Sequence, residues 1–339
     1  MSDIVKNISI PRDEVLSLSR EILELVGTPT EFAFSVAESL VQAQEAGHAS
    51  HGIIRLLEYT DSVKRKVIDA SVRPTILHEE GATAVIDSKW GWGQIACKFA
   101  VGIAAEKART FGIAAISIKD CNHIGRVGEY VEMLAAQNLI SIMWCNADPA
   151  VAAYGGRERL FGTNPFAAGI PSNDVPVVID LATAASAEGK LRVARANGSK
   201  VPLGVLVDKN GQESTDPADF YAGGALLPFG GHKGYCLSLM IELLGGTLSG
   251  NHPSMNSGYR HGYGTVLIAI DPNKFFGAEF SKNEISEATK IIRATQPSNP
   301  DQPVLVPGDV ENNERKKNSS GIQISETIWN SIKELKLAL

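Results

Sequence analysis

Two short segments that each contain a histidine could carry out proton transfer. The first is SHGIIR, residues 50–55, in which His51 and Arg55 are four residues apart and would share one face of a helix. A histidine can exchange a proton near neutral pH, and an arginine can bind a carboxylate through two parallel hydrogen bonds. Together they suit a small 2-oxo or 2-hydroxy acid. The structural alternative is a helix start with Ser50 as its N-cap and a solvated arginine.

The second histidine lies in NHIGRVGEY, residues 122–130. His123 follows the apolar run IAAISIKD, and ligand sites in α/β sheets gather where strands end. Gly125 and Gly128 would let a ligand or another backbone approach closely. The alternative is a tight strand-to-helix turn capped by Asn122.

Two further segments are candidates for nucleotide or anion binding. Asp180 ends an apolar strand and is followed by small residues that leave room for a cofactor, although it could instead cap the next helix. In FGGHKGYC, residues 229–236, three glycines and Lys233 precede a helix. The N–H groups at such a helix start bind anions.

GWGQIA, residues 91–96, has the glycine spacing of a dinucleotide-binding loop between a strand and a helix. Three details oppose that interpretation. SKW separates the strand from Gly91, Trp92 lies between the glycines, and Asp120 comes 24 residues after Ala96, where a ribose-binding acid is expected after about 20. We therefore expect a structural turn here and a cofactor site elsewhere.

These side chains need a scaffold, and the hydropathy pattern predicts both helices and strands. Helical spacing predicts three helices between residues 12 and 65, with Thr28 as the N-cap of the second. Residues 251–264 are predicted to form a loop and residues 296–321 an irregular arm. Strands are predicted at 74–80, 82–88, 113–120, 139–146, 176–182 and 263–270, and further helices at 97–112, 128–137, 235–246 and 324–337. This order predicts an α/β or α+β core.

Composition excludes several classes of protein. The 339 residues are 44% hydrophobic and 21% charged, with a net charge of -6 and interspersed charges, so neither nucleic acid nor a membrane surface is an expected partner. No apolar run approaches the ~20 residues of a membrane span, and the N-terminus lacks the apolar core of a signal peptide. The cysteines form no metal-type pair, and buried free thiols predict a cytoplasmic protein without a metal site. The cysteines are Cys97, Cys121, Cys145 and Cys236.

Taken together, these segments resemble the malate/L-lactate dehydrogenase family of the non-Rossmann type, which includes sulfolactate and ureidoglycolate dehydrogenases, diketogulonate reductase and piperideine-2-carboxylate reductase. The resemblance covers the chain from about residue 12 onward. Its motifs are residues 50–55, 122–130, 161–171, 180–190, 229–250 and the tail segment 306–315.

The resemblance implies an α/β fold with a central mixed, largely antiparallel sheet, which is a non-Rossmann nucleotide-binding fold. Residues 76–284 would bind cofactor and substrate, and residues 1–75 with 285–339 would form a helical domain. The implied activity is hydride transfer between NAD or NADP and a small 2-hydroxy or 2-oxo acid, in a homodimer. Some relatives reduce a cyclic imine instead.

The resemblance also implies residue roles. His51 and His123 would divide the tasks of exchanging a proton and holding the substrate oxygen, with Ser50 beside them. Arg55 would bind the carboxylate, and Thr163 and Asn164 would line the pocket. The implied cofactor contacts are Asp180, Leu181, Ala182, His232, Lys233, Gly308 and Asp309.

Two positions depart from the family pattern, and some alternatives stay open. Asp309 stands where many relatives have Glu, and Ala147 where many have Ser. NAD and NADP are not distinguished, since no cation can be placed near the ribose from sequence; the candidates are Arg157, Lys190 and Arg192. A cyclic-imine reductase is the second interpretation. A non-catalytic ligand-binding protein of the same fold is the third, and the intact histidines oppose it.

Overall fold

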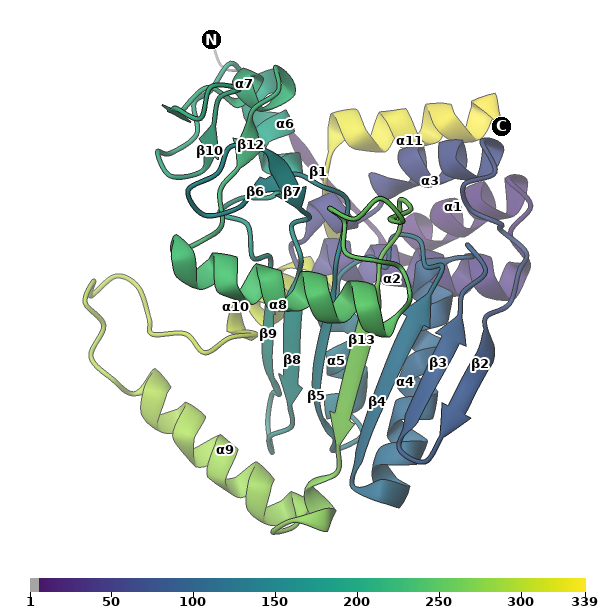
Figure 1. Cartoon of the computed structure of the whole chain (residues 1–339), viewed down its shortest axis with the longest axis vertical. Coiled ribbons are helices and arrows are strands. Elements are labelled where there is room, and N and C mark those ends of the chain that lie inside the picture. Colours follow the sequence, from purple (N-terminus) through teal and green to yellow (C-terminus); the bar gives the residue numbers. More distant parts are fainter. Residues whose placement is uncertain (1–5) are drawn as a thin grey trace.

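The computed structural model describes residues 6–339 and is built around a seven-stranded sheet (Figure 1). Every neighbouring pair in the order β2-β3-β4-β13-β5-β8-β9 is antiparallel except β3 with β4. The strands are β2 (Thr75–Glu80), β3 (Thr83–Asp87), β4 (Ile113–Lys119), β13 (Thr265–Ile270), β5 (Ile140–Cys145), β8 (Phe166–Ile170) and β9 (Val177–Leu181). The predicted mixed, largely antiparallel sheet is confirmed, and β8 is the one of its strands that the sequence pattern did not predict.

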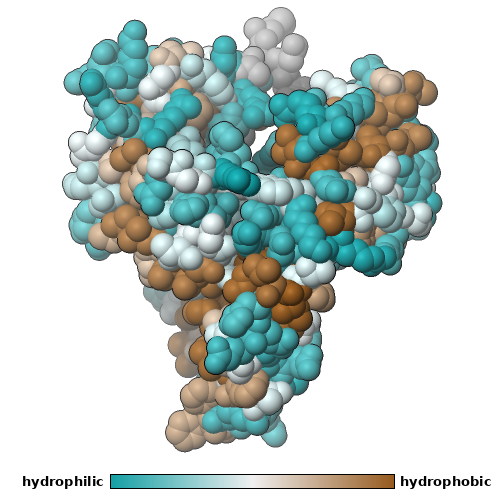
Figure 2. Space-filling view, turned by 45° about the vertical axis from the view of Figure 1, so that its right-hand side comes forward, coloured by the Kyte–Doolittle hydropathy of each residue, from teal (hydrophilic) through white to brown (hydrophobic). Residues whose placement is uncertain are grey.

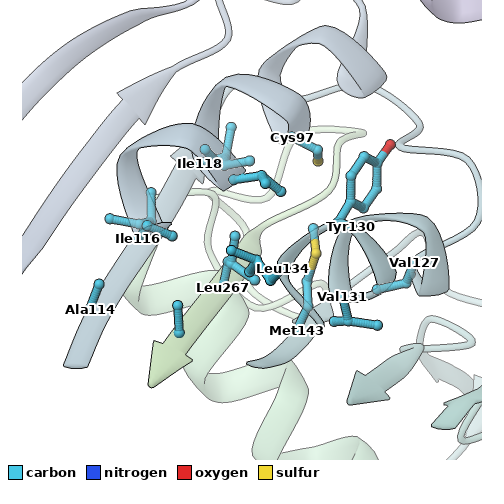
Figure 3. Close-up of a cluster of buried hydrophobic side chains, with 14 of the residues drawn as sticks. Cys97, Ala114, Ile116, Ile118, Val127, Tyr130, Val131, Leu134, Met143 and Leu267 are labelled. Atoms are coloured by element: carbon cyan, nitrogen blue, oxygen red, sulfur yellow. The ribbon is translucent and has the colours of Figure 1, made fainter. Parts of the chain in front are cut away.

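Helices cover both faces of this sheet (Figure 1). α4 (Gly93–Phe111) packs on β4 and α5 (Gly128–Ala135) packs on β8, while α8 (His232–Leu248) crosses the opposite face over β13 and β5. In α4 an alanine recurs every four residues and each is fully buried, so the helix lies close to the sheet. These residues are Ala96, Ala100, Ala104 and Ala108. Figure 3 shows the apolar core between sheet and helices, with Ile116, Leu134, Met143 and Leu267.

Both ends of the chain contribute to a second core. It joins α1 (Arg12–Leu25), α2 (Thr30–Glu45), α3 (Arg55–Lys64) and α11 (Glu326–Ala338). Beside them β1 (Asn7–Ile10) pairs antiparallel with β14 (Ile322–Ser325). Trp92 belongs to this core, so the turn before α4 ties the terminal helices to the sheet. The domain boundaries given above stay a prediction.

A small lobe and a projecting arm complete the fold (Figure 1). The lobe holds a five-stranded sheet in the order β11-β10-β12-β6-β7. Its elements are β6 (Val151–Ala152), β7 (Arg159–Phe161), α6 (Glu188–Ala196), β10 (Leu206–Val207), β11 (Glu213–Ser214), α7 (Pro217–Tyr221) and β12 (Ala225–Leu226). The arm is α9 (Ala278–Arg293), which follows the 3-10 turn η2 (Pro272–Lys274). No helix within residues 6–339 is long and apolar enough to cross a membrane.

Three local predictions are wrong. Thr28 does not cap α2: the N-cap is Pro29, no side chain caps the helix, and Thr28 Oγ1 is buried without a hydrogen-bond partner among the described residues. Segment 296–321 is not wholly irregular, because it contains α10 (Asp309–Lys317) and the 3-10 turn η3 (Asn318–Ser320). Cys236 is exposed, because it lies on the outer side of α8, whereas the other three free cysteines are buried.

Candidate active site

The structure brings the two candidate histidines together. The rings of His51 and His123 stack with their centroids 5.6 Å apart and an angle of 15° between their planes. His51 ends the 3-10 turn η1 (Ala49–His51), and Arg55 begins α3, so the two do not share one continuous helix as predicted. The break comes at Gly52, whose Cβ would lie 2.2 Å from Gln44 Oε1, which leaves no room for a side chain there.

Ser50 and Arg55 surround His51. Ser50 Oγ lies 3.2 Å from His51 Nδ1, and Arg55 donates from Nε to the Ser50 carbonyl at 2.7 Å. Arg55 also forms an ion pair with Glu58 at 2.6 Å. Its Nη2 has no protein partner within residues 6–339, so the Nη2 edge of the guanidinium can still donate to an anion.

A buried polar chain supports His123. Tyr59 Oη lies 2.7 Å from His123 Nδ1, and Gln94 Nε2 donates to Tyr59 Oη at 2.7 Å. Tyr263 packs edge-on against the same imidazole, with ring centroids 5.4 Å apart. Because Nδ1 is held by Tyr59, Nε2 is the ring nitrogen left for a substrate.

Burial and nearby positive charge keep both histidines uncharged. Burial, followed by the charge of Arg55, lowers the pKa of His51 from 6.5 to about 3. The same two causes, with His51 as a further contributor, lower the pKa of His123 well below its usual value. Burial also raises the pKa of Tyr59, so the phenol keeps its proton. The free site therefore presents neutral imidazoles at neutral pH.

The GWGQIA segment lies directly beneath His123. A Cβ on Gly93 would lie 2.5 Å from the carbonyl oxygens of Asn122 and His123, so only glycine lets α4 begin this close to the histidine loop. Gln94, the next residue, supplies the hydrogen bond to Tyr59. Asn122 donates to the carbonyl oxygens of Trp90 and Gly91 and holds the two loops together.

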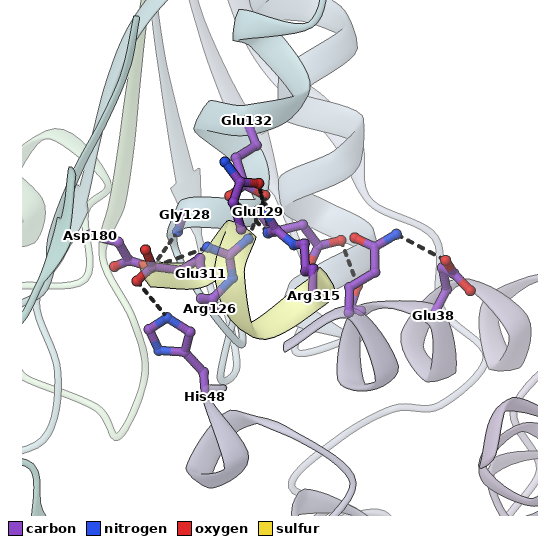
Figure 4. A network of polar contacts seen from close by, with 12 residues as sticks. Glu38, His48, Arg126, Gly128, Glu129, Glu132, Asp180, Glu311 and Arg315 are labelled. Carbon is purple, nitrogen blue, oxygen red and sulfur yellow. Dashed lines mark hydrogen bonds and ion pairs between the residues drawn. The ribbon is translucent and has the colours of Figure 1, made fainter. Parts of the chain in front are cut away.

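Asp180 is engaged with the start of α5 rather than with a following helix (Figure 4). Its Oδ2 accepts from Gly128 N at 2.9 Å and lies 3.8 Å from Arg126 Nη1. Arg126 is 3% exposed and pairs with Glu132 at 2.5 Å, but its Nε and Nη1 are buried without a hydrogen-bond partner among the described residues. Burial raises the pKa of Asp180, and the charge of Arg126 opposes that shift.

The expected cofactor segments lie side by side. Phe229 N donates to the Thr183 carbonyl at 3.0 Å, and Ala184 forms a β-bridge with Pro228, so the residues after Asp180 run along the approach to α8. Residues 181–184, with Pro228 and Phe229 beside them, are called the cofactor strip below. Leu181 is 37% exposed at its edge, with Ala182 half-buried beside it.

The start of α8 has the features of an anion cradle. Gly230 and Gly231 both have positive φ, and Gly231 is an N-cap without a side-chain hydrogen bond. His232 and Lys233 are exposed at the first helical positions. A Cβ on Gly234 would lie 2.0 Å from the Phe229 carbonyl oxygen, so the chain turns tightly into the helix. The uncapped N–H groups of this 17-residue helix fit a nucleotide phosphate.

The tail segment, residues 306–315, packs against the same region (Figure 4). Gly308 is buried with φ +100, next to the backbone of β9, and the Pro307 carbonyl accepts from Val178 N. The Asp309 carboxylate accepts two hydrogen bonds from Arg293, so its side chain is already occupied. Glu311 reaches His48 at 3.3 Å and fixes α10 beside the histidine segment.

Asn164 and Thr163 lie behind the surface of the site. Asn164 is 0% exposed and donates from Nδ2 to the buried carboxylate of Glu242 at 2.8 Å, while its Oδ1 accepts from Ala147 N. The carbonyl oxygen of Thr163 accepts from Thr183 N at 2.9 Å. Asn164 therefore fixes backbone rather than presenting its amide to solvent, whereas Thr163 is half-buried and contributes its carbonyl oxygen.

Several residues of the site gave no signal in the sequence. Tyr59 and Gln94 lie in ordinary helical patterns, and Arg126 and Glu242 become conspicuous only because they are buried. The spacing of Tyr59 four residues after Arg55 was the one available hint, since such a pair lies on one side of α3. Within the described residues no group of three or more acidic, cysteine or histidine side chains is placed to hold a metal.

Comparison with known proteins identifies the family. Residues 10–333 match the family model described as malate/L-lactate dehydrogenase. The malate/(S)-sulfolactate dehydrogenase of Methanothermus fervidus is 38% identical, over 96% of both chains. Among solved structures, sulfolactate dehydrogenase from Methanocaldococcus jannaschii matches with a TM-score of 0.88, 34% identity and coverage of 97% of this chain and 96% of that one.

A second solved structure widens the range of chemistry. The delta1-piperideine-2-carboxylate reductase from Pseudomonas syringae matches with a TM-score of 0.85, 32% identity and coverage of 97% and 99%. The paired histidines and glycine-rich helix start therefore lie on a shared scaffold, and the chain belongs to the malate/L-lactate dehydrogenase family of oxidoreductases.

Proposed function

We propose that this protein transfers hydride between NAD or NADP and a small 2-hydroxy or 2-oxo acid. The observation that carries the proposal is the pair of stacked, uncharged histidines with Arg55 beside them and the Gln94–Tyr59 chain behind His123. A 2-hydroxy acid needs a proton acceptor at its hydroxyl group and a cation at its carboxylate. The site has both: His123 can accept the proton, and Arg55, bonded to the Ser50 carbonyl beside His51, can bind the carboxylate.

His123 exchanges the proton at Nε2. Its low pKa keeps the imidazole neutral. Nε2 can accept the hydroxyl proton of the hydroxy acid when the single ring proton of the neutral form lies on Nδ1, which donates it to Tyr59 Oη before and after the transfer. Tyr59 in turn can donate to Gln94 if the amide turns, since Gln94 Oε1 is buried without a partner.

The remaining residues of the cluster orient the substrate. Arg55 binds the carboxylate through its free guanidinium face, and His51, with Ser50 beside it, contacts the substrate oxygen. Thr163 and Asn164 shape the pocket from behind, by fixing the backbone at Ala147 and Thr183.

The bound nicotinamide cofactor supplies or accepts the hydride. Leu181 and Ala182 would contact it along the strip beside Phe229, and His232 and Lys233 would bind its phosphates at the start of α8. Asp180 fixes the start of this strip through its hydrogen bond with Gly128 N. Gly308 places the tail segment 306–315 against β9, and Asp309 is held there by Arg293.

Cyclic-imine reduction is the second candidate. The structural match to a piperideine-2-carboxylate reductase favours it, and the same acid group and carboxylate-binding arginine would serve an imine acid. The three buried free thiols favour a reducing, cytoplasmic location for either activity.

The test is a matrix of activities on the purified protein. NADH and NADPH are each combined with oxaloacetate, pyruvate, sulfopyruvate and piperideine-2-carboxylate, and turnover identifies the substrate class. His123→Gln should lower kcat roughly 100-fold or more, within the range of general acid–base catalysis. Lys233→Ala should mainly raise the KM for cofactor. Cofactor binding without turnover of any substrate, or a His123→Gln variant with normal kcat, would refute the proposal.

We also propose a homodimer. Large apolar side chains are exposed along one stripe of α8 and on the α9 arm, and Figure 2 shows apolar side chains gathered in patches on the surface. They are Met240, Leu243, Leu244 and Leu248 on α8, and Phe275, Phe276, Phe280, Ile291 and Ile292 on or beside α9. A second copy would remove this surface from water.

A further inference from the structure

A cavity at the end of β4 lies beside the candidate active site and has a different lining. Its volume is about 270 Å³, and Lys119, Asp120, Asn251, His252, Gly258 and Arg260 contribute to its wall. Lys119 and Arg260 are cationic, and Asp120 is the one carboxylate among them. None of them belongs to the histidine cluster or the cofactor strip.

The charges in this cavity favour an anion. Lys119 Nζ lies 3.4 Å from the Asp120 carboxylate, which leaves Arg260 without an ion-pair partner among residues 6–339. Two permanent cations therefore face one carboxylate, on a chain with a net charge of -6. A local excess of positive charge on an acidic protein concentrates small anions there.

The backbone around the cavity is held rigidly. His252 has a backbone φ of +65, a conformation that residues other than glycine rarely adopt. It is fixed there because its N–H donates to the Gly246 carbonyl at 2.9 Å and its own carbonyl accepts from the buried Asn146. Strained positions held by their surroundings are found at ligand sites.

The opposite wall is also strained. Asp120 has φ +48, and its carbonyl oxygen accepts from Trp90 N at 2.8 Å. A Cβ on Gly258 would lie 3.1 Å from the ring of His252, so the loop closes against this imidazole only with glycine there. The site is therefore preformed and would need little ordering on binding.

We propose that this cavity binds a small multivalent anion, a metabolite that carries phosphate or several carboxylates, at a site separate from the catalytic histidines. Lys119 and Arg260 bind the anionic oxygens, and Asp120 accepts from a hydroxyl or weakens binding when the ligand has none. Asp120 is three residues before His123 in the same segment, so occupation of the cavity can affect the catalytic loop.

The test is isothermal titration calorimetry of the full chain with inorganic phosphate, citrate and, as a monovalent control, chloride. One saturable site per chain for phosphate or citrate is expected, and whichever binds more tightly identifies the class. The measurement needs neither substrate nor cofactor, so its result is independent of the proposed dehydrogenase activity. Absence of saturable binding by both multivalent anions would overturn the proposal.

Charge variants with opposite expected effects make the test specific. Lys119→Gln and Arg260→Gln should each weaken binding roughly tenfold, as the loss of one charge-assisted hydrogen bond would. Asp120→Asn should strengthen it, and asparagine tolerates the left-handed backbone at this position. Lys209→Gln, at an exposed lysine in the small lobe, is the matched control. Equal affinity in Arg260→Gln and Lys209→Gln, or weaker binding in Asp120→Asn, would refute the site.

Discussion

At the scale of single residues, Tyr59 is the most informative position for the mechanism. Its hydroxyl is the group that Nδ1 of His123 contacts, and Tyr59→Phe removes that oxygen while keeping the buried ring. We predict a fall in kcat of roughly 10- to 100-fold with little change in the KM for the acid, because the general acid–base group is left without its partner. The pH profile of kcat should also shift.

The control for this experiment is Tyr221→Phe, which removes an exposed hydroxyl that donates to Glu188 in the small lobe. Its kcat should stay normal. If Tyr59→Phe also kept the kcat and pH profile of the parent enzyme, the Tyr59–His123 contact would have no part in proton transfer.

The lowered histidine pKa values also predict how stability depends on pH. Below pH 6.5 the unfolded chain protonates His51, whereas the folded chain does not until about pH 3. The unfolded state therefore binds more protons in this window, and the free energy of unfolding should decrease as the pH falls from 6.5 towards 3. His51→Gln should flatten that dependence, measured by denaturant titration between pH 6.5 and 5. An unchanged slope in His51→Gln would show that this imidazole titrates normally in the folded state.

Sequence reasoning found the residues whose chemistry is visible in their type and missed those whose role depends on burial. His51 and His123 stood out as histidines beside glycines, and the structure stacks them. Gln94 lay inside a segment that resembled a phosphate loop, and its contact with Tyr59 joins residues 35 positions apart. No local pattern encodes such a contact, because it depends on how α3 and α4 pack.

At the scale of elements, the start of α5 depends on a glycine. A Cβ on Gly128 would lie 2.4 Å from Arg126 Nη1 and 2.6 Å from Asp180 Oδ2, and the second of these contacts belongs to a hydrogen bond. We predict that Gly128→Ala destabilises the protein by about 1–3 kcal/mol, as overpacking in a core does. Denaturant unfolding would measure the loss.

Gly102 gives a matched control in the neighbouring helix. It lies within α4, and a Cβ there would meet nothing within 4 Å. Gly102→Ala should therefore stabilise the protein by roughly 0.5–1 kcal/mol through helix propensity alone. A stable Gly128→Ala variant would show that Arg126 and Asp180 can move apart without cost.

Elements with strong periodicity were predictable, and those fixed by tertiary contacts were not. The Ala-rich α4 and the apolar β13 follow the pattern expected for a buried helix and a central strand. β8 has the sequence FAAGI within a segment rich in glycine and proline, and pairing with β5 and β9 on both sides makes it a strand. The 3-10 turn that ends at His51 interrupts what the spacing predicted as one helix, because Gly52 packs against Gln44.

At the scale of the whole molecule, the exposed apolar surface of α8 and α9 is the basis of the proposed homodimer. Phe276 is 87% exposed and Leu243 is 45% exposed, and burying such side chains contributes about 1.5–3 kcal/mol each. We predict a dimer at micromolar concentration by analytical ultracentrifugation. A double variant, Phe276→Glu with Leu243→Glu, should be monomeric with an unchanged far-UV circular dichroism spectrum, since both side chains point away from the core.

The control is Leu203→Glu, at a 67% exposed leucine of the small lobe, which should stay dimeric. A parent protein that sediments as a monomer, or a control that dissociates as readily as the double variant, would contradict a dimer formed through α8 and α9.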